Sequence, residues 1–96
     1  MTARLIDGKA IAASVRTAVK ERVTEFTART GVRPGLTVVL VGENPASQVY
    51  VRNKGKAASE AGFLSRQIDL PAITKESELL DLVARLNADD TVHGIL

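Results

Sequence analysis

The sequence predicts an α/β fold in which helices alternate with the strands of a parallel sheet. Three observations predict it: helical apolar patterns recur along the 96 residues, short β-branched runs separate them, and turn signals stand between the two. Alternation of this kind is expected to give right-handed crossovers around a parallel sheet. We find no repeat, low-complexity segment or linker, so residues 1–96 should belong to one small domain.

The first half of the chain predicts a long helix, a strand and a second helix. Apolar residues at helical spacing run between Asp7, a possible N-cap, and Gly31, a plausible stop; they are Ile11, Val15, Val19, Val23 and Phe26. After an Arg-Pro-Gly turn, residues 36–41 form a continuous apolar run typical of a strand buried on both faces. Asn44 can then cap, and Pro45 can begin, a helix that continues to about Ala61.

The second half predicts a strand, a helix and the start of a further strand. Residues 64–70 alternate imperfectly and end before Pro71, as a second strand would. Apolar residues then repeat at intervals of three and four, which favours an amphipathic helix closed by residues 87–90; they are Leu79, Leu82, Val83 and Leu86. Residues 92–96 are typical of a third buried strand, and we expect the chain to be truncated within it.

Composition points to a small molecule as the binding partner. The formal net charge is only +2, and the basic residues are scattered among acidic ones, which argues against nucleic acid. The three aromatic residues Phe26, Tyr50 and Phe63 offer few stacking platforms for single strands. The absence of cysteine excludes disulfides and thiolate catalysis. The first residues lack the apolar run of a signal peptide or membrane span, so we expect a cytoplasmic protein with no membrane partner.

One lysine of the second predicted helix stands among apolar residues. At about 100° per residue, one stripe of that helix holds six residues: Ser47, Tyr50, Val51, Lys54, Ala58 and Ala61. Arg52, Lys56 and Glu60 fall on the opposite side, where solvent is expected. Lys54 is therefore the cation whose position calls for an explanation.

Three polar residues of this stripe, Lys54, Tyr50 and Ser47, each have a structural and a functional interpretation. Lys54 could extend its ammonium to water along a packed stem; alternatively, apolar surroundings would disfavour its charged form and suit it to donate or accept a proton near neutral pH. Tyr50 could be a packing residue, or could stack on a ring and present its hydroxyl to the same substrate. Ser47 most simply satisfies a local backbone group in the first helical turn, and the alternative is that it touches a ligand.

The sequence contains no second motif for catalysis or for binding a phosphate, a dinucleotide or a metal. His93 has no ligand or carboxylate partner at suitable spacing, so we interpret it as a structural histidine at the start of a strand. Gly55 and Lys56 do not form a phosphate loop, because Ala57 replaces the required Ser or Thr. No Gly-x-Gly-x-x-Gly follows a strand, and no metal-binding spacing is present, so the chain itself should hold neither a dinucleotide nor a metal.

The chain resembles the bifunctional methylenetetrahydrofolate dehydrogenase/methenyltetrahydrofolate cyclohydrolase family. The family signature Val-Gly…Ser-x-x-Tyr-Val-x-x-x-Lys is matched in spacing by Val41-Gly42, Ser47, Tyr50-Val51 and Lys54. Matches continue at residues 56–58, at Gly62, and at residues 86–89 and 92–96, so the resemblance covers nearly the whole chain. It implies the amino-terminal substrate domain of a two-domain dehydrogenase.

The resemblance implies roles for individual residues, and it implies that parts of the intact enzyme are missing from this chain. Lys54 and Tyr50 would be catalytic, and Ser47, Tyr50 and Val51 would bind the folate substrate. The intact enzyme would be a homodimer in one-carbon metabolism that serves purine and amino-acid biosynthesis, oxidising 5,10-methylenetetrahydrofolate with NADP and hydrolysing the methenyl product to 10-formyltetrahydrofolate. The NADP-binding Rossmann domain and an active-site Gln beyond Leu96 would be absent from this chain.

Two other functions compete with this one. The chain could be a catalytically incomplete folate-binding or dimerising fragment, which substrate turnover by the purified chain would distinguish. It could also be the substrate domain of another two-domain dehydrogenase, such as the shikimate type, but residues 47–54 do not match that motif.

Overall fold

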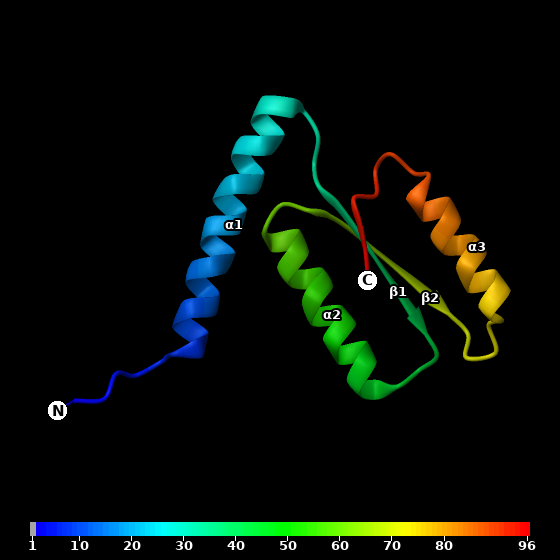
Figure 1. Ribbon diagram of the computed structural model, residues 1–96, viewed down its shortest axis with the longest axis horizontal. Coiled ribbons are helices and arrows are strands. Elements are labelled where there is room, and N and C mark those ends of the chain that lie inside the picture. Colours follow the sequence, from blue (N-terminus) through cyan, green and yellow to red (C-terminus); the bar gives the residue numbers. More distant parts are fainter. Residues whose placement is uncertain (1) are drawn as a thin grey trace.

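The computed structural model describes residues 2–96 and has the alternating order that the sequence predicts (Figure 1). The elements in chain order are α1 (Gly8–Thr30), β1 (Gly35–Val41), α2 (Pro45–Glu60), β2 (Leu64–Leu70), α3 (Glu76–Asn87) and β3 (Gly94–Ile95). Each helix and strand falls where the sequence places it, except that β3 is shorter than the expected residues 92–96.

The three strands form one parallel sheet with β1 in the centre. The strand order is β2-β1-β3. On one side the register runs from Gly35 opposite Leu64 to Val41 opposite Leu70, and on the other Leu36 lies opposite Gly94. Because parallel neighbours need crossover connections, α2 and α3 are the elements that link these strands.

Burial of β1 on both faces confirms the expectation drawn from its continuous apolar run. Thr37 is 1% exposed and Val38 is 2% exposed. Successive residues of a strand point to opposite faces, so both faces of β1 are covered. Val38 and Leu40 pack with Val51 of α2 in the core. This packing fixes α2 against the sheet.

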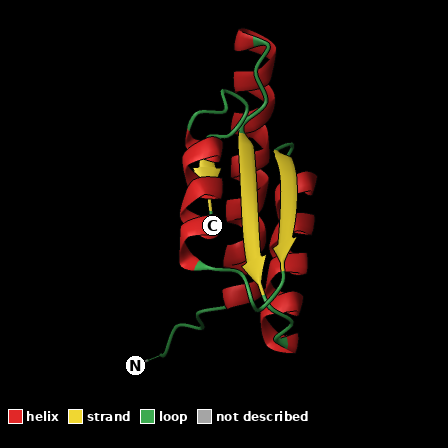
Figure 2. Ribbon diagram, turned by 90° about the vertical axis from the view of Figure 1, so that its right-hand side faces the viewer, coloured by secondary structure: helices red, strands yellow, loops and turns green. Residues whose placement is uncertain are grey.

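The helices lie in layers on either side of the sheet. Figures 1 and 2 show α2 on one side of the strands and α3 on the other. The chain crosses from β1 to β2 in one direction and returns past β1 to β3 in the other. Two right-handed crossovers in opposite directions place their helices on opposite faces, as observed here.

The first helix has the predicted ends, but most of its apolar stripe is exposed. The Asp7 side chain accepts from the amide of Ala10, and Gly31 ends the helix at φ 73°. Among the α1 residues only Val23 is buried; Ile11 and Val15 are more than half exposed. Figure 1 shows why: α1 stands at the edge of the molecule beside α2, which lies between α1 and the strands.

Two features are absent from residues 2–96, the part of the chain that the structure describes. No helix there is both long enough and apolar enough to cross a bilayer. No group of three or more His, Cys, Asp or Glu side chains in that range is placed to hold a metal ion.

Candidate functional site

The turn between β1 and α2 sets the position of the candidate site. Gly42 follows β1 at φ 88°, a left-handed conformation that favours glycine. The Asn44 side chain accepts from the amide of Ser47 at 3.1 Å, and Pro45 occupies the first helical turn. The predicted cap and start of α2 are confirmed. The helix therefore begins at the carboxyl end of the central strand, where open α/β sheets bind ligands.

Lys54 and Tyr50 contact each other across one turn of α2. The Lys54 Nζ donates a hydrogen bond to the Tyr50 Oη at 2.7 Å and lies 4.8 Å from the centre of its ring. A nitrogen so much closer to the hydroxyl than to the ring centre lies beyond the hydroxyl end of the ring. We therefore assign the contact to the hydrogen bond rather than to the π-face of the ring.

The stem of Lys54 lies in a mainly apolar hollow between α1 and α2. The hollow has a volume of about 310 Å³, and Lys54 is half-buried. Its lining comes from both helices, the central strand and the segment after α2: Val15, Arg16, Val19, Leu36, Lys54, Ala57, Ala58, Ala61 and Phe63. The apolar surroundings expected for Lys54 are thus present. Arg16 is a second cation at this hollow that the sequence analysis did not identify, since only folding brings α1 beside α2.

Ser47 and Val51 occupy different environments on the same helix. Val51 is 5% exposed and packs with Val38 and Leu40, so its side chain belongs to the core. Ser47 is half-buried, and its backbone amide rather than its hydroxyl takes part in the cap of α2. Tyr50, with 55% of its surface exposed, lies between them at the open edge of the stripe.

The opposite side of α2 is exposed, as the sequence predicts. Arg52, Lys56 and Glu60 are all exposed. A second hollow of about 700 Å³ opens on this side at the carboxyl ends of β1 and β2, lined by Leu40, Gly42, Glu43, Gln48, Arg52, Gln67, Asp69, Leu70, Pro71 and Ala72. It is larger than the hollow beside Lys54, but neither Tyr50 nor Lys54 lines it. Its polar groups include the Gln67 amide, which donates to Asp69 at 2.8 Å.

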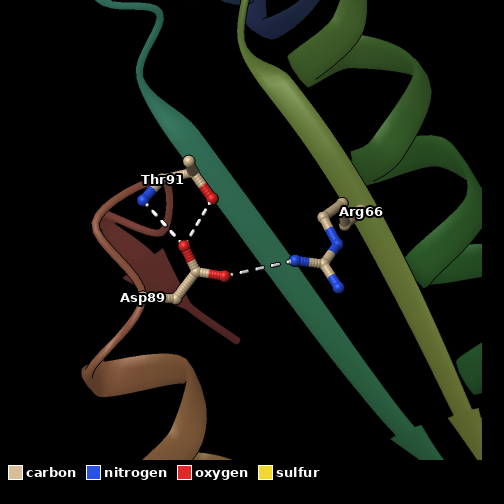
Figure 3. A network of polar contacts seen from close by, with 3 residues as sticks. All are labelled: Arg66, Asp89 and Thr91. Carbon is tan, nitrogen blue, oxygen red and sulfur yellow. Dashed lines mark hydrogen bonds and ion pairs between the residues drawn. The ribbon is translucent and has the colours of Figure 1, made fainter.

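A polar network ties the loop after α3 to the edge strand (Figure 3). One oxygen of the Asp89 carboxylate accepts from the Thr91 hydroxyl at 2.6 Å and from its amide at 2.9 Å; the other lies 3.6 Å from Arg66 of β2. The hydrogen bonds from Thr91, and then the charge of Arg66, hold the pKa of Asp89 below its ordinary value. The network orients the loop that leads into β3.

The turn after β1 does not fit a dinucleotide. It reads Gly-Glu-Asn-Pro, with a single glycine where a pyrophosphate site needs a glycine-rich turn. Pro45 removes a backbone donor at the helix start, and Glu43 adds a negative charge. The described residues therefore provide no NADP site at this position.

Fold and site together define an α/β domain that carries a tyrosine–lysine pair on the helix after its central strand. The family model for the tetrahydrofolate dehydrogenase/cyclohydrolase catalytic domain matches residues 6–96. The chain belongs to this family.

Relatives of known name and structure agree in sequence and fold. The chain is 56% identical to a bifunctional protein FolD of Caulobacter vibrioides over 98% of its own length, and 56% identical to that of Moorella thermoacetica over all of it. It spans 32% and 34% of those relatives, about a third of their length.

Two solved structures also match. A methylenetetrahydrofolate dehydrogenase-cyclohydrolase of Trypanosoma brucei, solved with NADP and an inhibitor, gives a TM-score of 0.92 at 38% identity; the match covers 100% of this chain and 33% of that one. A 5,10-methylenetetrahydrofolate dehydrogenase of Bombyx mori gives 0.93 at 36%, covering 99% and 33%. These matches confirm the predicted family and fold.

Proposed function

We propose that this chain forms part of the folate site of an enzyme that oxidises 5,10-methylenetetrahydrofolate with NADP and hydrolyses the methenyl product to 10-formyltetrahydrofolate. The observation that carries the proposal is the hydrogen bond between Lys54 and Tyr50, on a stripe with the family's spacing. Family membership supplies the substrate class. The geometry supplies the candidate groups for the hydrolytic step.

In hydrolysis, water adds to the cationic methenyl carbon and loses a proton, which gives a neutral carbinolamine. One C–N bond then breaks as its nitrogen gains a proton, and the carbinol oxygen loses its remaining proton to solvent as the formyl C=O forms. A group that first accepts and then donates a proton serves both halves of this reaction. Lys54 suits that role because its stem lies in an apolar hollow while its nitrogen reaches the open edge at Tyr50. The Tyr50 hydroxyl accepts from Lys54 and so holds the nitrogen in one place.

The other residues of the stripe have supporting roles in this proposal. The exposed ring of Tyr50 is available to stack on the aromatic part of a folate, which would fix the reacting carbon relative to Lys54. Ser47, one turn nearer the start of α2, could contact the same ligand through its hydroxyl. Val51 is buried, so we propose that it affects substrate binding by holding α2 against the sheet.

The remaining walls of the site would come from the part of the full-length enzyme that corresponds to the other two-thirds of the relatives, which this chain does not span. The chain spans about a third of those relatives, and its own turn after β1 does not fit NADP. We therefore propose that the NADP site lies in the part of the full-length enzyme that this chain does not span. The isolated chain should neither bind NADP nor reduce it in the presence of methylenetetrahydrofolate, and measurable reduction would contradict this assignment.

Binding by the isolated chain tests the folate site directly. Tyr50 is the only tyrosine, so the signals of a tyrosine ring in an NMR spectrum come from it alone. Titration with a stable folate, such as 5-formyltetrahydrofolate, should shift these ring signals upfield through stacking. Tyr50→Leu should weaken binding, while Arg52→Leu on the opposite side should not. Equal affinity for all three chains would contradict the proposed site.

The alternative is a folate-binding or dimerising module without turnover. Cyclohydrolase activity, measured as loss of methenyltetrahydrofolate absorbance in a full-length enzyme that contains this domain, distinguishes the two. A cytoplasmic location remains a proposal. A homodimer and service to purine and amino-acid biosynthesis are proposals that rest on the family resemblance, and sedimentation of the full-length enzyme tests the homodimer.

A further inference from the structure

We propose that His93 is a pH-sensitive positioning residue, whose neutral imidazole holds β3 in register on the central strand and whose protonation releases it. The proposal concerns the sheet edge rather than the residues of α2, and does not depend on the proposed function. It rests on a pair of hydrogen bonds between His93 and Gly35.

His93 and Gly35 exchange two hydrogen bonds. The backbone amide of His93 donates to the Gly35 carbonyl at 2.8 Å, and the Gly35 amide donates to the Nδ1 of the His93 ring at 2.8 Å. In a regular ladder a backbone carbonyl would accept from the Gly35 amide. Here the side chain of His93 takes the place of that carbonyl at the first position of the β1–β3 pairing.

This arrangement fixes the protonation state of the ring. A nitrogen that accepts a hydrogen bond carries no hydrogen, so the ring is neutral and its hydrogen is on Nε2. Protonation would place an N–H of the ring against the N–H of Gly35, and the bond would be lost. Because the ring is exposed to solvent, protons reach it without unfolding of the chain.

The hydrogen bond from the Gly35 amide lies at the amino-terminal end of the β1–β3 pairing, directly before Leu36 opposite Gly94. Beyond His93, β3 pairs with β1 from Leu36 opposite Gly94 to Thr37 opposite Ile95. After this ladder, Leu96 donates to the Thr37 carbonyl at 3.0 Å, and Val39 donates to the Leu96 carbonyl at 2.8 Å. The approach at Gly35 is also close, since a Cβ there would collide with the Thr91 carbonyl oxygen.

The surroundings of His93 decide which pH values can test the proposal. The hollow beside the ring is lined by Val83 and Asn87 of α3 and by Val92, Gly94 and Ile95, none of which titrates. In the preceding loop, Asp90 is exposed and Asp89 is engaged with Thr91 and Arg66. Carboxyl groups ordinarily titrate near pH 4, whereas histidine titrates near pH 6.5, so about pH 5 separates the two.

The test compares amide hydrogen exchange at about pH 7.5 and about pH 5, on either side of the ordinary histidine range. Protection factors, corrected for intrinsic exchange, are followed for the amides of Gly35 and Leu96; the Gly42 amide, which donates to Leu70 on the other side of β1, is the internal control. We expect protection at Gly35 and Leu96 to fall by about 2- to 10-fold at the lower pH, the effect of one hydrogen bond, with Gly42 unchanged.

Two variants isolate the ring nitrogen. In His93→Asn the side-chain oxygen takes the place of Nδ1 and does not titrate, so protection should be high and equal at both pH values. In His93→Leu it should be low at both. A fall of equal size in the wild-type chain and in His93→Asn would overturn the proposal.

The tautomer of the His93 ring can be measured on the wild-type chain alone, so this test does not depend on whether a variant folds. The ¹⁵N shifts of the imidazole at neutral pH should show an unprotonated Nδ1 and a protonated Nε2. The opposite tautomer would also overturn the proposal.

Discussion

Lys54 donates a hydrogen bond to the hydroxyl of Tyr50 across one turn of α2, at 2.7 Å. The two side chains are therefore held together, with the nitrogen of Lys54 at the hydroxyl end of the Tyr50 ring. Residues four apart on a helix share a face, which is why two groups with different chemical roles can be placed together by one short segment.

Removing only the Tyr50 hydroxyl should separate catalysis from binding. In a full-length enzyme containing this domain, Tyr50→Phe keeps the stacking face but releases Lys54. Loss of one hydrogen bond to a charged group corresponds to a factor of about 10 to 100. We therefore expect the cyclohydrolase kcat of Tyr50→Phe to fall by about 10- to 100-fold, while KM stays nearly unchanged. Tyr50→Leu removes the ring as well and should also raise KM. Kinetic constants for Tyr50→Phe equal to those of the wild-type enzyme would show that the hydroxyl has no separate role, and equal constants for Tyr50→Phe and Tyr50→Leu would show the same of the ring.

Gly35 should tolerate no side chain, because a Cβ there would collide with the backbone oxygen of Thr91. We expect Gly35→Ala to lower the free energy of unfolding by about 1–3 kcal/mol or more, as overpacking does. Gly8, the first residue of α1, has nothing within 4 Å of the Cβ position. Gly8→Ala should be neutral or stabilising by up to about 1 kcal/mol. Denaturant unfolding of the two variants measures the difference, and similar losses would contradict the close approach.

Asp89 should make the stability of the chain depend on acid. Hydrogen bonds from Thr91 lower its pKa in the folded chain. Its contribution is therefore complete above the unfolded pKa of about 3.9 and is lost as the pH falls through the lower folded value. The stability difference between the wild-type chain and Asp89→Asn should stay constant from neutral pH to about pH 5 and then change on further acidification.

Thermal unfolding across that pH range measures this effect. Thr91→Val removes the hydroxyl that donates to Asp89 and should reduce the acid dependence, whereas a stability difference that does not vary with pH would contradict the assignment.

The order of helices and strands could be predicted because its signals are local. Asp7, Asn44 and Gly31 act on backbone groups within a few residues, and the structure confirms all three as helix ends. Pro71 likewise marks the end of β2 despite imperfect alternation. The place of Lys54 among apolar residues followed from helical spacing alone.

Contacts between distant segments could not be predicted in this way. The ion pair of Arg66 with Asp89 joins β2 to the loop that follows α3. The sequence around either residue does not indicate that the other is its partner. Helical spacing in α1 predicted an apolar stripe but not that Ile11 and Val15 would be exposed, since burial depends on which surfaces meet. The reach of Lys54 to the Tyr50 hydroxyl depends on side-chain rotamers, which spacing does not specify.

The central claim is that Lys54 transfers protons, and Lys54→Met in a full-length enzyme containing this domain tests it. Methionine keeps an unbranched apolar stem in the hollow between α1 and α2 but removes the nitrogen. Arg52→Met and Lys56→Met, on the exposed face, are the matched controls.

The measurement is the cyclohydrolase rate at saturating methenyltetrahydrofolate. For Lys54→Met we predict a fall of about 10²- to 10⁴-fold, the usual contribution of general acid–base catalysis, with stability changed by less than about 1.5 kcal/mol and both controls close to wild type. A rate for Lys54→Met near that of the wild-type enzyme would contradict the account and leave Lys54 as a packed stem with a solvated charge.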